Sequence, residues 1–392
     1  MDSWPPETPQ DAQDTVACPK DHDNARAIKI ISEYLSENAQ EFRTLAALRQ
    51  KVHCPRSPLL TEKRLLTVYA KGWENPAGDE FFRKQRQVAY QSRDDPKTCR
   101  IFYEMMKNIA HDMHKATGVF DILTSSTNDP KILDFCVAPG GYLETSMWHD
   151  PRAQATAFSL GQDQGGHEIL MPPNPRMTIK FMDITMLAAD MGVETIPEGH
   201  PDHANFLPRE LAPDQFFDLV ICDGQVLRTN VHARAEYRES REATRLTLTQ
   251  LALGLEHLTL GGTMVVLLHH METWGTLCLM RKMHQFASVQ LFKHPKCHAK
   301  RSAFYLIATQ VDPRFPQAKE AIEEWKGIWK VATFGSEEAY RDVTHASDAE
   351  VHSLLKDFGP HLVEIARPIW VIQAKALEKA PFVKGAPRGW GP

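Results

Sequence analysis

The chain has 392 residues and a formal net charge of −5 at pH 7. Its length allows two domains, or one α/β domain with large additions, and its slight negative charge excludes a general attraction to nucleic acid, so contact with RNA would need a local basic patch. Apolar runs stay shorter than the roughly 20 residues that cross a bilayer, so we expect no membrane segment. The seven cysteines lack the spacing of a zinc site, so we expect reduced thiols and no metal. Together these features predict an intracellular protein, cytoplasmic or nuclear.

The composition predicts four parts in chain order. Residues 1–23 are rich in proline and acids and poor in apolar residues, which is typical of a disordered lead. Residues 24–118 carry apolar residues at helical spacing and are predicted to form a helical N-terminal extension. Residues 119–312 alternate short apolar runs with amphipathic segments, which indicates an α/β domain around a parallel sheet. Residues 313–392 return to helical spacing and end in a polar tail.

Seven apolar runs in the α/β part predict seven strands. The amphipathic segment 238–258 predicts a crossover helix before the fifth strand, and Gly261 with Gly262 is expected to end that helix. The last two runs are separated by the short segment 295–301, so they should form an antiparallel hairpin at the edge of the sheet. Residues 196–213 are predicted to be a long loop. The predicted strands are 131–137, 155–160, 177–184, 216–224, 262–270, 288–294 and 302–311.

Two glycines, Gly140 and Gly141, follow the first predicted strand directly and precede a helical segment. A tight strand-to-helix turn would explain the pair, but side-chain-free backbone before a helix N-terminus also lets a ligand approach. Three acids favour the ligand: Asp134, Asp183 and Asp223 stand at or near the ends of the first, third and fourth strands. Because the carboxyl ends of parallel strands share one edge of the sheet, these acids should converge on one crevice.

The crevice lacks the motifs of the common nucleotide sites. A nicotinamide site would show GxGxxG with an acid about 20 residues later, and a P-loop would show GK[ST]; the sequence has neither. A cleft with several carboxylates instead suits a ligand that carries positive charge. S-adenosylmethionine, a sulfonium with an ammonium group, is such a ligand.

Two segments carry a family resemblance. "LDFCVAPGGYLETSMW" (133–148) and "FDLVICDGQ" (217–225) resemble motifs of the FtsJ-like (RrmJ-like) class I S-adenosylmethionine-dependent methyltransferases, and the similarity extends over about 101–310. More narrowly, the chain is similar to fungal FtsJ-domain proteins with helical extensions. The resemblance implies an α/β class I (Rossmann-like) fold and an FtsJ-like methyltransferase with S-adenosylmethionine as cofactor.

The resemblance also implies cofactor-binding residues. Residues 138–142 would line the methionine and the ribose, Asp183 and Ile184 would contact the adenine, and Asp223 would lie beside the amino group and the sulfonium. The second strand ends in Leu160 where the family has an acid, and Asp163 is the nearest substitute. The full set implied is Asp134, Ala138, Pro139, Gly140, Gly141, Tyr142, Leu160, Asp183, Ile184 and Asp223.

The family's 2′-O-ribose methyltransferases use a Lys-Asp-Lys-Glu set, which this chain keeps in part. Asp223 is the aspartate. The first lysine corresponds to Lys107 or Lys115, although Glu104 stands near the expected place.

The other two positions of that set are vacant. The fifth strand offers leucine where the second lysine belongs, with His269 and His270 just beyond, and Ala303 replaces the glutamate. A histidine could replace the lysine, because a neutral imidazole accepts a proton near neutral pH, or both could be ordinary strand-end residues. The catalytic candidates are Asp223, Lys107 and His270, with in-line attack of a substrate hydroxyl on the sulfonium methyl.

Three functions fit these observations. By resemblance the leading one is methylation of an RNA ribose; the alternatives are a biosynthetic methyltransferase for a small molecule and a catalytically inactive domain that binds RNA or protein. The last hairpin could contact phosphates or could simply be solvated. The sequence does not determine the oligomeric state. The basic residues of the hairpin are Lys293, Lys296, Lys300 and Arg301, with His294 and His298 beside them.

Two further features have alternative interpretations. The charged segment 228–246 could form a lid, but its alternating signs favour ion pairs at the start of an exposed helix. Tyr142 and Trp148 could stack on adenine, although core packing is the simpler prediction for Trp148.

Overall fold

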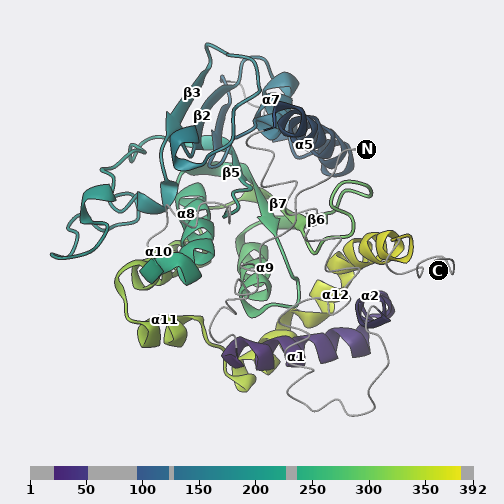
Figure 1. The fold of residues 1–392 in the computed structure, drawn as a ribbon. Coiled ribbons are helices and arrows are strands. Elements are labelled where there is room, and N and C mark those ends of the chain that lie inside the picture. Colours follow the sequence, from purple (N-terminus) through teal and green to yellow (C-terminus); the bar gives the residue numbers. More distant parts are fainter. Residues whose placement is uncertain (1–21, 52–94, 123–127, 227–235, 381–392) are drawn as a thin grey trace, which may run out of the picture.

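A computed structural model describes residues 22–51, 95–122, 128–226 and 236–380 of the protein. Within these ranges seven strands form one sheet in the order β3-β2-β1-β4-β5-β7-β6, with β1 to β5 parallel and β7 antiparallel to both neighbours (Figure 1). The predicted α/β sheet with an antiparallel hairpin is thereby confirmed. The strands are β1 (Lys131–Asp134), β2 (Gln154–Ser159), β3 (Met177–Phe181), β4 (Phe217–Cys222), β5 (Leu258–Leu268), β6 (Ser288–Phe292) and β7 (Phe304–Val311).

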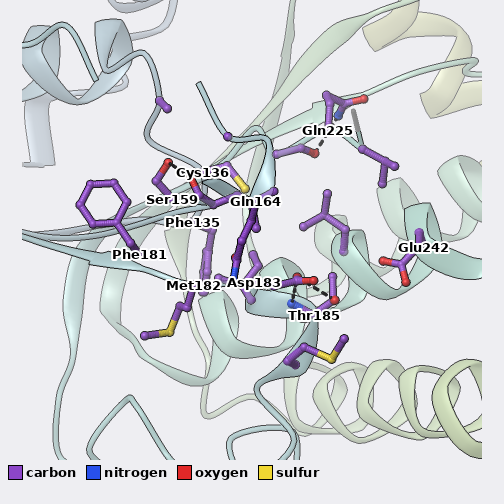
Figure 2. Close-up of a pocket in the computed structure, with 18 of the residues that line it drawn as sticks. Phe135, Cys136, Ser159, Gln164, Phe181, Met182, Asp183, Thr185, Gln225 and Glu242 are labelled. Atoms are coloured by element: carbon purple, nitrogen blue, oxygen red, sulfur yellow. Dashed lines mark hydrogen bonds between the residues drawn. The ribbon is translucent and has the colours of Figure 1, made fainter. Parts of the chain in front are cut away.

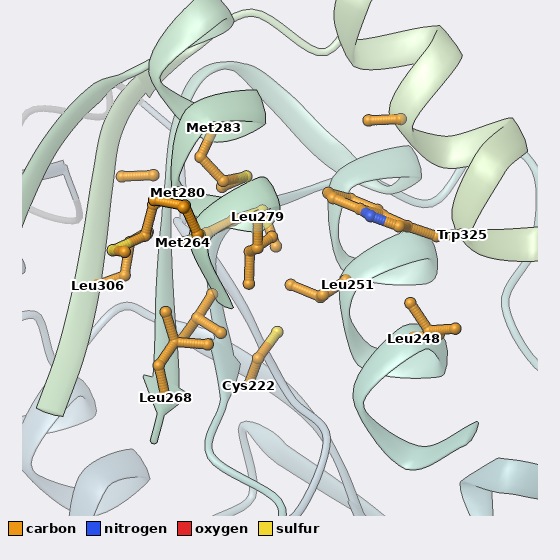
Figure 3. Close-up of a cluster of buried hydrophobic side chains, with 14 of the residues drawn as sticks. Cys222, Leu248, Leu251, Met264, Leu268, Leu279, Met280, Met283, Leu306 and Trp325 are labelled. Carbon is orange, nitrogen blue, oxygen red and sulfur yellow. The ribbon is translucent and has the colours of Figure 1, made fainter. Parts of the chain in front are cut away.

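Helices cover both faces of the sheet. Because successive strand residues point to opposite faces, β1 places Ile132 in one core and Leu133 in the other. On the Ile132 side lie α5 (Pro96–Thr117) and α7 (Gly141–His149); on the Leu133 side lie α8 (Glu242–Glu256), α9 (Trp274–Phe286) and α10 (Pro316–Phe334). Figure 3 shows the second core, where side chains of β5 and β7 meet those of α8, α9 and α10: Met264, Leu306, Leu251, Met280, Met283 and Trp325.

The two helical extensions meet on the outside of the Leu133 side. The C-terminal helix α12 (Asp348–Glu378) begins with a capping box, in which Ser347 Oγ accepts from Glu350 N and Glu350 Oε2 accepts from Ser347 N. It packs against α1 (His22–Asn38) and α2 (Gln40–Lys51), and α11 (Glu337–Thr344) connects it to α10 (Figure 1). The short 3₁₀ helices are η1 (Gln162–Gln164), η2 (Ile184–Met186), η3 (His203–Asn205) and η5 (Glu236–Arg241).

The end of the crossover helix differs from the prediction. Gly261 and Gly262 do not end the crossover helix: α8 ends at Glu256, and the glycines lie inside β5, which starts at Leu258 because Leu258 already pairs with Phe217 of β4. Residues 1–21 of the predicted disordered lead, the middle of the N-terminal extension (52–94) and the end of the polar tail (381–392) lie outside the described residues. Residues 22 and 23, predicted to belong to the disordered lead, are part of α1. The four-part division stays a prediction. No helix in the described ranges combines the length and the apolar content that a membrane span needs.

Candidate active site

A cavity of about 660 Å³ opens at the carboxyl ends of β1 and β4, where the strand order reverses. This is the position at which open α/β sheets bind ligands, and the volume is in the usual range of ligand pockets. Figure 2 shows Asp183 near the centre of the wall, Gln225 and Glu242 toward one side and Phe181 toward the other. Five of the predicted cofactor residues line the cavity: Ala138, Leu160, Asp183, Ile184 and Asp223.

Asp223 follows β4 and is the most unusual of these residues. Its Oδ1 atom is buried and accepts no hydrogen bond from the residues that the structure describes. Burial raises the pKa of Asp223 to about 7. Asp134, at the end of β1, is 1% exposed, and burial together with the charge of Asp223 raises its pKa. A cationic group in the cavity would satisfy the unpaired oxygen and favour the charged carboxylate.

Asp183 follows β3 and serves as the N-cap of η2. Its Oδ1 accepts from Thr185 N at 2.9 Å and from Thr185 Oγ1 at 2.8 Å. These bonds hold the carboxylate in the cavity wall, with buried Ile184 next to it. The predicted adenine-side pair is therefore brought to the same cavity as Asp223, although 40 residues separate the two acids in sequence.

The glycine pair has packing roles of its own. Gly140 has φ +106°, a conformation that side chains rarely adopt, and a Cβ there would lie 2.9 Å from Met171 Cγ. A Cβ on Gly141 would lie 2.6 Å from the carbonyl oxygen of Tyr103 and 2.6 Å from Met106 Cβ, both on α5. The absence of a side chain at Gly141 thus allows α5 and α7 to touch. The sequence pattern did not predict this packing role.

The rest of the 138–142 motif divides between wall and core. Of these residues, all of which the structure describes, Ala138 lines the cavity, and Pro139, Gly140, Gly141 and Tyr142 are not part of its wall. Tyr142 is 5% exposed, and its hydroxyl hydrogen-bonds that of Tyr305 on β7. Burial raises the pKa of Tyr142. Its predicted contact with the cofactor stays a prediction.

The end of β2 offers a substitute for the missing acid. Leu160 lines the cavity, and so does Asp163 in η1, two residues beyond Gly161. A Cβ on Gly161 would lie 2.4 Å from Asp163 Oδ1, so the absence of a side chain there lets the carboxylate fold back over the backbone. Asp163 is thereby in the same wall as Asp183 and Asp223.

Lys107 lies beside the cavity but not in its wall. Its Nζ is 3.0 Å from Glu144 Oε2 on α7, and the Tyr103 hydroxyl donates to the same carboxylate. The preceding residue, Met106, lines the cavity. Glu104, the other candidate position on α5, pairs with Arg100 at the surface, 3.3 Å away.

His270 is also outside the wall. Its side chain is 51% exposed, and Nδ1 lies 3.4 Å from Glu272 Oε1. The neighbouring His269 is closer to the cavity, because its Nε2 is 3.0 Å from Oε1 of Gln225, a wall residue. Burial lowers the pKa of His269 to about 4. The sequence predicted both histidines as candidates for the same role. Only the structure shows which of the two side chains lies beside the cavity.

The comparisons with known proteins agree with this geometry. The family model described as FtsJ-like methyltransferase matches residues 109–311, just over half of the chain. The chain belongs to the FtsJ-like methyltransferase family. Membership supports S-adenosylmethionine as the cofactor and confirms the family that the motifs predicted.

The solved structures that match this chain do so at low identity and include three methyltransferases. An O-methyltransferase family protein from Burkholderia thailandensis is 13% identical (57% of this chain and 62% of that chain covered, TM-score 0.31). A putative ribosomal RNA methyltransferase from Plasmodium falciparum is 14% identical (52% and 96%, TM-score 0.32). Human methyltransferase-like protein 13 in complex with SAH is 13% identical (62% and 97%, TM-score 0.31). The curated proteins gave no match.

This FtsJ-like chain contains a buried ion network that the sequence analysis placed at the surface. Arg238 and Glu242, both 6% exposed, line the cavity and pair at 2.6 Å, and Glu242 also pairs with fully buried Arg245 at 2.7 Å. Arg245 Nε donates to Thr333 Oγ1 of α10. The predicted i, i+4 ion pair is present, but the predicted exposure of the helix start is wrong. The spacing of the charges in the sequence indicated the pair, but not that α10 covers it. The first part of the predicted lid, residues 228–235, lies outside the described ranges.

The predicted core packing of Trp148 is wrong. Its side chain is not in the core and not in the cavity wall; it is 69% exposed and meets the edge of the His111 ring at 5.7 Å. The reason is that α7 packs its buried residues, such as Leu143 and Met147, on the sheet and on α5, which leaves Trp148 on the solvent side.

Proposed function

We propose that this protein is an S-adenosylmethionine-dependent methyltransferase that acts on a ribose 2′-hydroxyl of RNA. Family membership supports the cofactor and the class of reaction. The observation that carries the proposal is the unpaired, buried Oδ1 of Asp223 in the wall of the cavity. An anionic oxygen that lacks a donor in a buried site is unfavourable unless a cationic ligand completes it.

Six wall residues have a proposed part in holding the cofactor. Asp223 would accept from the ammonium group, Asp163 would replace the missing ribose-binding acid, and Asp183 with Ile184 would flank the adenine. Ala138 and Leu160 would give apolar contact. The bound cofactor supplies an electrophilic methyl group on a sulfonium. The remaining motif residues, Asp134 and 139–142, would support this wall from behind rather than touch the ligand.

The acceptor would enter on the Gln225 side of the cavity. A hydroxyl held in line with the methyl group reacts faster mainly because it is positioned, so little base strength is required. The predicted proton handlers are Lys107 and His270. Of the two neighbouring histidines, His269 is the one whose ring reaches a wall residue of the cavity, with Nε2 3.0 Å from Gln225 Oε1, so it is better placed than His270 to take a proton from the reacting atoms. Asp223, which was predicted to be catalytic, would contribute to the reaction only by holding the cofactor.

The basic hairpin gives partial support to RNA as the substrate, because only some of its basic side chains are exposed. Lys293 is 3% exposed and His294 is 5% exposed, so neither presents its charge to a long polymer. Lys296 is exposed, and Lys300 and Arg301 are half-buried. The missing lysine on the fifth strand and the alanine at position 303 favour a second candidate, a small-molecule methyltransferase whose nucleophile needs less activation. The narrower resemblance to fungal FtsJ-domain proteins stays a prediction.

Calorimetric titration of the full chain with S-adenosylmethionine and S-adenosylhomocysteine tests the cofactor. Asp223→Asn should weaken S-adenosylmethionine by about 10- to 100-fold, as expected for loss of a hydrogen bond to a charged group. Asp214→Asn, an exposed acid just before β4, is the matched control and should bind as the wild type does. Wild-type protein that binds neither compound would overturn the proposal.

Transfer of a labelled methyl group tests the acceptor. We expect label in RNA transcripts, at the ribose, which makes the adjacent phosphodiester resistant to alkali. Label in low-mass acceptors and none in transcripts would replace RNA by the small-molecule alternative. Cofactor binding without transfer to either would indicate a binding module.

A further inference from the structure

Gln225 lies at the edge of the cavity where the acceptor would enter. It follows Asp223 by two residues, it is exposed, and it belongs to the cavity wall. Its side-chain amide contacts the protein twice: Nε2 donates to the carbonyl oxygen of Gly224 at 3.0 Å, and Oε1 lies 3.0 Å from Nε2 of His269. The direction of these two hydrogen bonds decides what the amide can offer to a ligand.

The backbone fixes which way the Gln225 amide faces. A carbonyl oxygen only accepts, so the Gly224 oxygen requires the amide nitrogen beside it. The reverse orientation would place two oxygens 3.0 Å apart with no proton between them. Oε1 therefore faces His269, and because an amide oxygen only accepts, Nε2 of the imidazole must carry a proton and donate it.

The surroundings of His269 keep its ring neutral. Burial lowers its pKa to about 4, and the positive charges of Arg301 and Lys293 act in the same direction. Lys293 is itself fixed beneath the loop between β6 and β7, where its Nζ donates to the carbonyl oxygens of Arg301 at 2.8 Å and Ala303 at 2.6 Å. A neutral imidazole has a single N–H, and in His269 that N–H is the one bonded to Gln225. Any proton that His269 took up would therefore have to bind Nδ1.

Both partners of the bond between Gln225 and His269 are held from behind. On one side, Oε1 of Gln250 in α8 accepts from Gly224 N at 2.9 Å, and its Nε2 donates within the same helix. On the other side, Oγ1 of Thr276 in α9 donates to the carbonyl oxygen of His269 at 3.0 Å. A chain of hydrogen bonds thus runs from α8 through the Gln225 amide to the end of β5 and α9. This chain restricts the side chain of Gln225 although the residue is exposed.

The fixed amide keeps one donor and one acceptor for a ligand. A primary amide has two N–H groups and two lone pairs on its oxygen, and the bonds to Gly224 and His269 use one of each. Within the described ranges, the Gln225 side chain makes no further hydrogen bond. A hydroxyl group offers the matching pair, since it donates one hydrogen bond and also accepts.

We propose that Gln225 binds the hydroxyl group of the acceptor that is to be methylated, and that His269 positions Gln225 for this contact. The inference rests on the proposed function, because it requires a methyltransferase whose acceptor enters on the Gln225 side. The free lone pair of Oε1 accepts from the hydroxyl, which leaves the lone pairs of the hydroxyl oxygen for the methyl group. The free N–H of Nε2 suits a second oxygen on the adjacent carbon, which a ribose provides.

The acceptor contact is tested with Gln225→Leu in the full chain. Calorimetry should give an affinity for S-adenosylhomocysteine within about twofold of the wild type. The kcat/KM for transfer of a labelled methyl group should fall by about 10- to 100-fold. The probe is a set of RNA transcripts, or the low-mass acceptors if the wild type labels only those. Gln225→Glu keeps an acceptor oxygen but loses both amide donors, so its loss should be smaller.

Gln285→Leu is the matched control. Gln285 is an exposed glutamine of α9 and is not part of the cavity wall. The substitution removes the same amide from the surface and should change neither cofactor binding nor methyl transfer.

Nitrogen NMR of the full chain labelled at histidine tests the positioning role without cofactor or acceptor. The signals of His269 are assigned by their absence in His269→Gln. At about pH 7 we expect a proton on Nε2 and none on Nδ1 in the wild type. Gln225→Leu removes the partner that fixes this tautomer and should give a mixture of the two tautomers. Gln285→Leu should leave the tautomer unchanged.

The outcomes separate this inference from the proposed function. A proton on Nδ1 of His269 in the wild type, or the same tautomer in the wild type and in Gln225→Leu, would overturn the positioning role. Unchanged methyl transfer in Gln225→Leu would overturn the acceptor contact. A loss of S-adenosylhomocysteine affinity as large as in Asp223→Asn would overturn it too, because Gln225 would then touch the cofactor. Wild-type protein that transfers no methyl group would count against the proposed function itself, and the tautomer of His269 would still decide whether Gln225 is held.

Discussion

The two ends of the site differ in the sign of their buried charge. At the cofactor end, burial raises the pKa of Asp134 and of Asp223, so the acids shift toward their neutral forms. At the acceptor end, burial lowers the pKa of His269 and of His298, so the bases shift toward theirs. The same physical cause, desolvation of a charged form, acts at both ends in opposite directions.

The contrast indicates what each end requires. Buried ionisable groups without partners reduce stability, and they persist where a ligand of opposite charge completes them. An end lined by acids fits a sulfonium and an ammonium group. The two ends also differ in support: the cofactor end is braced by a buried ion network, and the acceptor end by one lysine beneath a surface loop.

The largest expected effect concerns that network. In Glu242→Gln, Arg238 keeps Asp202 at 2.8 Å, but buried Arg245 loses the one carboxylate that pairs with it among the described residues. The change should lower the free energy of unfolding by about 3–5 kcal/mol, measured by chemical denaturation. Glu337→Gln is the control: its carboxylate is 73% exposed and pairs with Arg241, so the loss should be at most about 1 kcal/mol. Equal losses in the two variants would show that the cofactor end does not depend on buried charge.

A smaller effect is expected where the cofactor end meets α5. In Gly141→Ala the new Cβ would lie 2.6 Å from the Tyr103 carbonyl oxygen, and separating α5 from α7 should destabilise the protein by about 1–3 kcal/mol in thermal or chemical unfolding. Gly275→Ala, in α9 with open space around its Cβ position, should be neutral or stabilising. If the two variants unfold alike, the close approach of α5 and α7 is not required.

The pH dependence of ligand binding tests the opposite signs directly. Asp223 must be ionised to hold the ammonium group of the cofactor, whose own pKa is about 8. S-adenosylmethionine affinity should therefore be highest just above the pKa of Asp223, which is about 7. Below it, affinity should fall by up to about tenfold for each pH unit, or about 1.4 kcal/mol. Titrations between about pH 6 and pH 8.5 measure this slope, and Asp223→Asn should flatten it. Affinity that rises on acidification would break the contrast with the acceptor end.

The smallest effect is expected outside both ends. Trp148 is 69% exposed, so Trp148→Ala should change the free energy of unfolding by no more than about 0.5 kcal/mol and leave cofactor binding unchanged. A loss of several kcal/mol in a denaturation curve would contradict the exposed position of Trp148 and would favour the core packing predicted from the sequence.

Local sequence patterns predicted the sheet well because each strand is a short apolar run that can be recognised by itself. Short apolar runs identified all seven strands with boundary errors of a few residues, and the short segment before β7 indicated the antiparallel pair. The acids Asp134, Asp183 and Asp223 were predicted to converge because parallel strands end at one edge. The error at Gly261 arose because a glycine pair has the same appearance at a helix end and inside a strand.

Long-range contacts were beyond such patterns. The sequence showed that Arg238 and Glu242 could pair, but not that α10 would bury them. It offered both histidines at the end of β5, but not which one would face Gln225. The bond between Arg49 and Gln373 joins residues 324 positions apart, so no local signal announces it.

The sequence by itself determined the class of fold, the family and the edge of the sheet that carries the site, since hydrophobic period and strand-end chemistry are local properties of the chain. The tertiary structure alone decided which ionisable groups lose their water, and therefore which acids and bases are held near neutrality. Burial depends on everything that packs around a side chain, and in this protein both terminal extensions take part in that packing.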